Sequence, residues 1–244
     1  MPTARHFVPK ELLAGKIHKQ AGKQVVMKTQ QRILDHYDVV IVGAGPSGIF
    51  SAYETKKINP AARILIIEKG HSIEKRRCPK RKSGVCAKCN PCNITTGFSG
   101  GGSFSDGKLS INDAGEIGGD LAAYIGLDKF RQILRYTDEL YVHFGADCRV
   151  YGSETSPASN AIHRSAAQAH LRLIDSRVRH MGTEKAYDIY ARIEHELESL
   201  GIDKHFQTNI QNLHVLGDGA GLTRGLMQAS MNGICMGRIL TGNW

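Results

Sequence analysis

The chain has 244 residues, of which 41% are hydrophobic and 23% charged, and these values are typical of a globular protein with one large or two small domains. No apolar run is long enough to span a bilayer and no signal peptide is recognisable, so we expect a soluble, cytoplasmic protein. The formal net charge is +9. This excess is partly local, because six of the eight residues 75–82 are basic.

Residues 1–36 are expected to form a basic N-terminal extension, with seven Lys or Arg against two acidic residues in the first 35. Such charge can attract nucleic acid, but no aromatic interleaving and no nucleic-acid module accompanies it. A solvated surface is therefore favoured over nucleic-acid binding. The folded domain is predicted to span residues 37–244.

The first core element is a β-branched apolar run at 38–42, which leads directly into a glycine-rich turn and an apolar stretch. Gly43 permits a tight turn, Gly45 allows backbone to approach a pyrophosphate, and Gly48 allows the helix to pack close to the strand. The amino end of that helix carries partial positive charge for phosphates. The complete turn is Gly43, Ala44, Gly45, Pro46, Ser47 and Gly48.

A second apolar strand at 62–67 ends in Glu68, twenty residues after Gly48. A carboxylate at this spacing is placed to accept hydrogen bonds from a ribose hydroxyl. Strand, glycine turn, helix and acid together predict a dinucleotide site. An ordinary glycine-rich turn would not account for the acid.

Residues 71–120 are predicted to be a long loop region rich in Gly, Ser, Asn and Cys, and loops of this length are usually functional. Four cysteines lie close together in it, namely Cys78, Cys86, Cys89 and Cys92. Three interpretations remain open for them: zinc or an iron–sulfur cluster, redox-active thiols, or loop cysteines with no common ligand. Cys148 and Cys235 are expected to be buried thiols.

Helical periodicity continues over 121–145, and a short helix is expected within 160–175. A further helix is predicted from Thr183, as its N-cap, to a stop at Gly201. The last segment is an apolar strand at 213–216, followed by Gly217, Asp218 and then a helix over 225–240. A carboxylate at a strand end can accept from ribitol hydroxyls, and the next helix points N–H groups at a flavin carbonyl.

Taken together, the chain resembles a family of uncharacterised bacterial and archaeal FAD-dependent dehydrogenases in the glutathione-reductase-like superfamily. The resemblance covers about residues 37–240. It rests on residues 40–48, 67–70, 77–79, 89–94, 100–109, 178–183 and 216–229.

The resemblance implies an α/β fold: a Rossmann-like FAD/NAD(P)-binding domain with a parallel sheet, flanking helices and a last strand beside the first. It implies FAD bound by the first and last motifs, with Glu68 on the adenosine ribose and Asp218 near the pyrophosphate and ribitol. Family members carry a large substrate region before the Gly-Asp-Gly strand, where this chain has only residues 201–211. The residues expected at the cofactor are Gly43, Ala44, Gly45, Pro46, Ser47, Gly48, Glu68, Lys69, Arg77, Gly217, Asp218, Gly225, Leu226 and Met227.

The sequence thus predicts an FAD-dependent oxidoreductase acting on a small-molecule redox substrate. A flavin-binding remnant without turnover and a basic flavoprotein acting on RNA are the alternatives. No catalytic acid or base can be assigned. Several further residues have both a functional and a structural interpretation. Arg76 either pairs with a phosphate or belongs to a solvated basic loop, and Ser105, Asp106 and Lys108 either meet the flavin ring or form an ordinary turn.

Arg179 and His180 either polarise a substrate or flavin or are structural. Met227 and Met231 are expected to pack in the core.

Overall fold

The computed structural model describes residues 34, 36–105, 107–152, 155–205 and 225–243. The chain divides into two units, Met1–Arg32 and Ile33–Trp244, and the described residues all belong to the second. The predicted strand at 213–216 and most of the N-terminal extension therefore lie outside the described residues. Within the described ranges, no helix has both the length and the apolar character that crossing a bilayer requires.

The central sheet has three parallel strands, β1 (Val39–Val42), β2 (Ile64–Ile67) and β5 (Asp203–His205), in the order β1-β2-β5. Val39 pairs with Ile64 and Ile67 pairs with His205. This small parallel sheet with flanking helices is consistent with the predicted α/β class. Sequence analysis missed β5, because three polar and charged residues offer no hydrophobic pattern.

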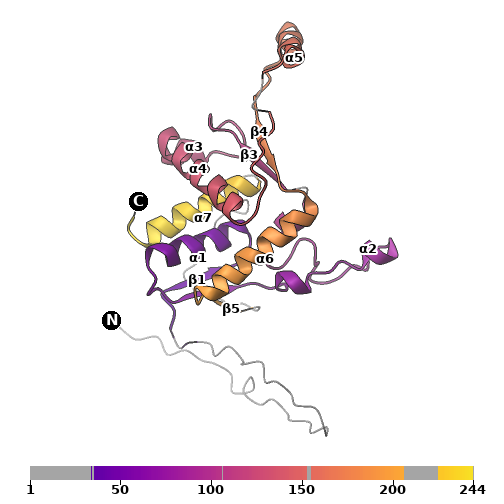
Figure 1. The fold of residues 1–244 in the computed structure, drawn as a ribbon. Helices are drawn as coiled ribbons and strands as arrows, with labels where there is room; N and C mark the ends of the chain where they lie inside the picture. Colours follow the sequence, from indigo (N-terminus) through magenta and orange to yellow (C-terminus); the bar gives the residue numbers. More distant parts are fainter. Residues whose placement is uncertain (1–33, 35, 106, 153–154, 206–224, 244) are drawn as a thin grey trace, which may run out of the picture. The chain divides into compact units, whose positions relative to one another are not determined.

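Helices α1 (Pro46–Ile58) and α7 (Leu226–Leu240) lie side by side, as the indigo and yellow helices of Figure 1 show. They approach each other backbone to backbone, since a Cβ on Gly233 would meet the Ser47 carbonyl oxygen at 2.2 Å. A Cβ on Gly237 would meet the Ser51 carbonyl oxygen at 3.0 Å. Gly233 faces Ser47 and Gly237 faces Ser51, so both chains run in the same direction and the two helices are parallel.

The predicted helix over 121–145 is two helices, α3 (Leu121–Ile125) and α4 (Leu127–His143), because Gly126 between them has a φ of +82°. Helix α6 (Thr183–Ser199) is capped by Gly182, which makes Thr183 its first helical residue rather than its N-cap. It ends before Gly201, as predicted, and Gly201 has a φ of +71°. Helix α1 is buried over residues 47–55, and it forms the core together with the apolar faces of α4 and α6. The large buried side chains are Phe50, Phe130, Ile133, Tyr141 and Tyr190.

The predicted loop region 71–120 contains short elements: the 3-10 helices η2 (Ile73–Lys75) and η3 (Gly102–Phe104), helix α2 (Lys80–Ser83) and strand β3 (Lys108–Ile111). Strand β3 pairs antiparallel with β4 (Arg177–His180), and sequence analysis predicted neither strand. Helix α5 (Pro157–Gln168) is the short helix expected in 160–175, although it begins earlier, and no described residue of it is buried.

Candidate functional site

The turn from β1 to α1 is tight and lies close to both strands of the sheet that flank it. Gly43 has a φ of +97°, and its N–H donates to the Ile67 carbonyl oxygen at 2.6 Å, which fixes the turn against β2. A Cβ on Gly48 would lie 2.2 Å from the Gly43 carbonyl oxygen and 3.0 Å from Cγ2 of Ile41. The tight turn at Gly43 and the close helix–strand packing at Gly48 agree with the predictions for these two glycines.

Gly45 is the N-cap of α1, and a Cβ built on it would have no atom within 4 Å. Pro46 occupies the start of the helix, where its lack of an N–H costs nothing. The first turn has no side-chain cap and no acidic residue. The amino end of α1 therefore combines open space with uncompensated partial positive charge, which suits an anionic group.

The amino end of α7 lies beside that of α1. The Ser47 hydroxyl donates to the Ala229 carbonyl oxygen at 2.8 Å, so this hydroxyl holds the second helix. Gly225 is the N-cap of α7 and Leu226 its first residue. Met227 and Met231 are buried in the core, as predicted. The predicted Gly217 and Asp218 lie outside the described residues.

A glycine-rich loop at 97–102 contacts both helix ends. The Ser99 N–H donates to the Ala44 carbonyl oxygen at 2.7 Å, and a Cβ on Gly100 would lie 3.6 Å from Cα of Gly45. A Cβ on Gly102 would lie 3.2 Å from Cδ1 of Leu226. The amino ends of α1 and α7 and this loop thus lie next to one another, and the surface that they form consists mainly of backbone.

Glu68, at the end of β2, is only 8% exposed and accepts three backbone hydrogen bonds. Oε2 accepts from Ala44 at 2.8 Å, and Oε1 accepts from Gly70 at 2.8 Å and from Gly97 at 3.0 Å. A carboxylate offers about four acceptor positions, so one remains for a further donor. Glu68 therefore ties three loops together and keeps a limited capacity for a ligand.

Arg76 is buried and holds the cysteine-containing loop together, so the interpretation of this side chain as part of a solvated basic loop was wrong. Its guanidinium donates to the carbonyl oxygens of Asn93 and Ile94 at 3.0 and 2.6 Å, and to that of Phe98 and the Ser99 hydroxyl. Burial lowers the pKa of Arg76 to about 10. Arg77 and Lys69, both predicted at the cofactor, are exposed.

The four clustered cysteines lie on a surface segment. Cys78 is half-buried, and Cys86, Cys89 and Cys92 are exposed. Among the described residues no three His, Cys, Asp or Glu side chains come together as a metal site, so the predicted zinc or iron–sulfur cluster has no support here.

Cys92 has an environment that favours its thiolate. Backbone N–H groups of Ile94 and Thr95 and the Thr95 hydroxyl hydrogen-bond to its sulfur, the Arg76 charge is nearby, and its pKa is lowered. Cys235 is buried as predicted, and burial raises its pKa to about 12. Cys148 is exposed, so the prediction of a buried thiol there was wrong, because it lies in the turn after α4 rather than in an element.

Of the other candidate residues, Ser105 and Arg179 are hydrogen-bonded within the protein itself. The Ser105 hydroxyl donates to the Gly102 carbonyl oxygen at 2.9 Å, as turn residues do. Asp106 lies outside the described residues, and Lys108 is exposed. Arg179 is buried in a bidentate pair with Asp138, at 2.8 and 2.7 Å. His180 is exposed, with its ring 5.3 Å from that of Tyr151.

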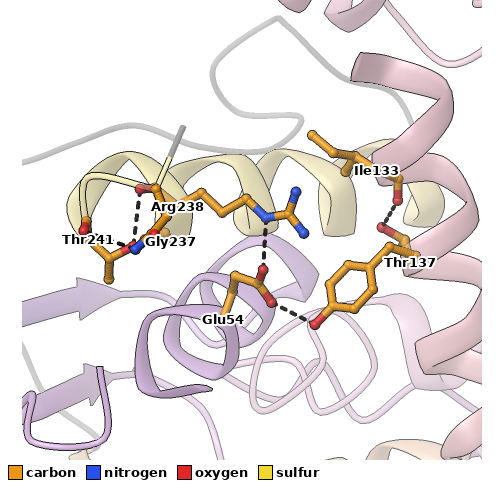
Figure 2. Close-up of polar contacts among 8 residues, drawn as sticks. Glu54, Ile133, Thr137, Gly237, Arg238 and Thr241 are labelled. Atoms are coloured by element: carbon orange, nitrogen blue, oxygen red, sulfur yellow. Dashed lines mark hydrogen bonds and ion pairs between the residues drawn. The ribbon is translucent and has the colours of Figure 1, made fainter. Parts of the chain in front are cut away.

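Sequence analysis missed two buried polar groups that hold α7 in place, one against α1 and α4 and the other against α4 and α6. Glu54 of α1 accepts a hydrogen bond from Nε of Arg238 on α7, as Figure 2 shows, and the two atoms are 2.9 Å apart. The Tyr136 hydroxyl donates to the same carboxylate at 2.8 Å. The second group joins Tyr190, Tyr141 and Ser230, with oxygens 3.0 and 2.8 Å apart. A buried acid in α1 gives no local signal, because its two partners are distant in sequence.

The close packing of α1 against α7 does have a local signal in the sequence. Small residues recur every fourth position in both helices: Ser47, Ser51 and Thr55 in α1, and Ala229, Gly233 and Gly237 in α7. This spacing places them on one face of each helix and indicates close helix packing.

No protein-family model matches the chain, and no curated protein matches it. A solved structure, that of L-amino acid deaminase from Proteus vulgaris, aligns with a TM-score of 0.33 and 12% sequence identity. The alignment covers 78% of this chain and 42% of that protein. A similarity this distant does not identify the function of the chain.

Proposed function

We propose that the chain binds FAD across the amino ends of α1 and α7 and acts as a flavin-dependent oxidoreductase. The observation that carries this proposal is the parallel packing of the two helices through Ser47 and Gly233. The amino ends of both helices carry partial positive charge, and because they lie side by side they can together bind one cofactor with two negatively charged phosphates.

The residues around these ends fit such a cofactor. Gly45 has no atom within 4 Å of its Cβ position, so pyrophosphate oxygens can approach the backbone. In the proposal, Glu68 accepts a hydrogen bond from a ribose hydroxyl at its remaining acceptor position. The carboxylate is already oriented for this by the N–H groups of Ala44, Gly70 and Gly97. Asp218, with Gly217, is proposed to complete the site from the segment before α7.

Bound FAD would supply hydride transfer at its ring system. The chain itself would orient the cofactor, and the amino end of α7 would stabilise negative charge that develops on the flavin carbonyl. Tyr141 and Tyr190 stay protonated, since burial raises the pKa of each. The substrate is proposed to be a small redox-active molecule.

The experiment compares FAD affinity in the wild-type protein and in Gly45→Val, with FAD titrations followed by flavin fluorescence. Because the site around Gly45 is open, the variant should fold, and its affinity should fall by about tenfold or more as the side chain blocks the pyrophosphate. Ala61→Val, an exposed position before β2, is the control. A wild-type protein with no measurable affinity for FAD, or equal affinity in Gly45→Val, would contradict the proposal.

Binding and turnover need separate measurements. Reduction of an artificial dye or a quinone by the FAD-loaded protein, with candidate electron donors, tests oxidoreductase activity directly. A protein that binds FAD but reduces no acceptor would be the flavin-binding remnant considered above.

A further inference from the structure

A cavity of about 420 Å³ lies where β3, α4 and β4 meet. None of its lining residues belongs to the proposed cofactor site. The lining combines an apolar floor with charged walls: Ile111, Asp113, Arg131, Leu134, Arg135, Asp138, Val150 and Arg177. Its volume is within the range of small-molecule sites, about 300–1,000 Å³.

Helix α4 provides half of the lining from one face. Residues 131, 134, 135 and 138 follow the i, i+3, i+4, i+7 pattern that places side chains in a row. Leu134 is buried, and Ile111 and Val150 are partly buried, so these three side chains form the apolar part of the lining. Arg131 and Arg135 come from the same face of α4 and belong to its charged part.

The aspartates of the pocket are already engaged. Asp138 is held by both nitrogens of the buried Arg179, at 2.8 and 2.7 Å. Asp113 accepts from Arg177 at 2.8 Å, and its carbonyl oxygen accepts from Nε of Arg131 at 3.0 Å. Neither carboxylate forms a hydrogen bond or an ion pair with Arg135.

Arg135 makes no hydrogen bond or ion pair with any residue that the structure describes. Arg131 forms an exposed ion pair with Asp128 at 3.8 Å, so of these two arginines only Arg135 has no partner among the described residues. Like charges four residues apart on a helix repel each other, and a bound anion would reduce this repulsion. A guanidinium binds carboxylate or phosphate through two parallel hydrogen bonds, which gives geometry as well as charge.

We propose that this pocket binds a small organic anion, with a carboxylate or phosphate held by Arg135 and Arg131 and an apolar body lying on Leu134, Ile111 and Val150. The site is separate from the proposed flavin site, and its existence does not depend on that function.

The test uses fluorine NMR of the purified full chain with three probes: fluorobenzoate, fluorophenyl phosphate and the neutral fluorobenzyl alcohol. At least one anion should bind with a dissociation constant below about 10 mM, and the alcohol should bind about tenfold more weakly or not at all. Whichever anion binds more tightly identifies carboxylate or phosphate as the preferred group.

Two variants and a matched control locate the binding. Arg135→Gln should weaken the anion by about tenfold, since a charge-assisted hydrogen bond pair is lost at an exposed position that does not affect folding. Val150→Phe should weaken both anions by filling the cavity. Arg164→Gln, an exposed arginine of α5 that also lacks a partner among the described residues, should leave the affinity unchanged.

Three results would overturn the proposal: no binding of either anion, equal binding of the neutral alcohol, or an equal loss in Arg164→Gln and Arg135→Gln. Circular dichroism melts of each variant establish that the fold is retained. Because the assay contains no FAD, its outcome is independent of the outcome for the flavin site.

Discussion

Gly233 of α7 lies directly on Ser47 of α1, and a Cβ at Gly233 would come within 2.2 Å of the Ser47 carbonyl oxygen. This contact joins residues 186 positions apart and brings the two helix ends together. The space is closed by backbone, which cannot move aside as a flexible side chain can. The distance between the helices, and with it the geometry of the proposed site, therefore depends on glycine at this position.

Gly233→Ala should destabilise the protein although alanine is the better helix former. Alanine gains about 1 kcal/mol of helix propensity, whereas forcing the two helices apart costs about 1–3 kcal/mol or more. Urea unfolding measures the balance. Gly101→Ala, at a position with open space and a negative φ, is the control and should change the free energy of unfolding little. Equal stability of Gly233→Ala and wild type would contradict the close contact.

The Glu54 carboxylate should be the most costly buried polar group to remove from the paired helices. Its side chain is 4% exposed, and Glu54→Ala leaves Arg238 and Tyr136 without their acceptor. Loss of one partner of a buried ion pair costs about 3–5 kcal/mol, and the lower end is expected because Arg238 is 28% exposed and can reach water. Tyr136→Phe should cost about 1.5–3 kcal/mol. Urea unfolding of Glu54→Ala, Tyr136→Phe and the double variant gives the coupling energy between the two side chains. If they are in contact, this energy is clearly above zero.

The three-hydroxyl chain has a single direction. Ser230 donates its one hydrogen to the Leu226 carbonyl oxygen at 2.8 Å, so it accepts from Tyr141, which in turn accepts from Tyr190. Tyr141→Phe should therefore leave the Tyr190 hydroxyl as a buried unsatisfied donor, at a cost of about 1–3 kcal/mol. Tyr190→Phe leaves no donor unsatisfied and should cost about 0.5–1.5 kcal/mol. Thermal unfolding of the two variants tests the order, and a more damaging Tyr190→Phe would refute this direction.

Arg76→Lys should open the loop that carries the cysteines. Lysine cannot reproduce the fork that reaches Asn93, Ile94 and Phe98, while it keeps a trypsin cleavage site. Cleavage by trypsin within 76–105 should become at least about tenfold faster, because proteolysis follows the population of the open form. Arg77→Lys is the matched control, since the neighbouring side chain is exposed and should tolerate the change. Equal cleavage rates would mean that Arg76 does not hold the loop.

Cys92 should react with iodoacetamide at lower pH than a free cysteine does. Hydrogen bonds from Ile94 and Thr95 and the Arg76 charge lower its pKa, so the reactive thiolate is already present at pH values where an ordinary thiol remains protonated. The rate should fall as the pH drops through this lowered pKa. Thr95→Val removes one donor and should move the profile to higher pH. Mass spectrometry of the alkylated peptide measures both profiles, and identical profiles for Cys92 and free cysteine would show that the hydrogen bonds have no effect.

Several features of the chain follow from sequence because they are local. The strand β1, the turn at Gly43, the start of α1 and the strand β2 were all predicted, since apolar periodicity and the special backbone of glycine act over a few residues. The stop of α6 before Gly201 is another local event, set by a left-handed residue. The break at Gly126 was missed because the apolar pattern continues across it.

The sequence alone determined the glycine turn, the acid at the end of β2 and the helix periods, because each is fixed by the conformational freedom and the polarity of neighbouring residues. Only the tertiary structure decided that α7 lies against α1, that Arg76 is buried while Arg77 is exposed, and that Glu68 receives three N–H groups from three loops. The physical reason is that these arrangements are contacts between distant segments. Whether a charged side chain is solvated or buried depends on which backbone groups folding brings within hydrogen-bond distance of it, and the local pattern of residues does not contain that information.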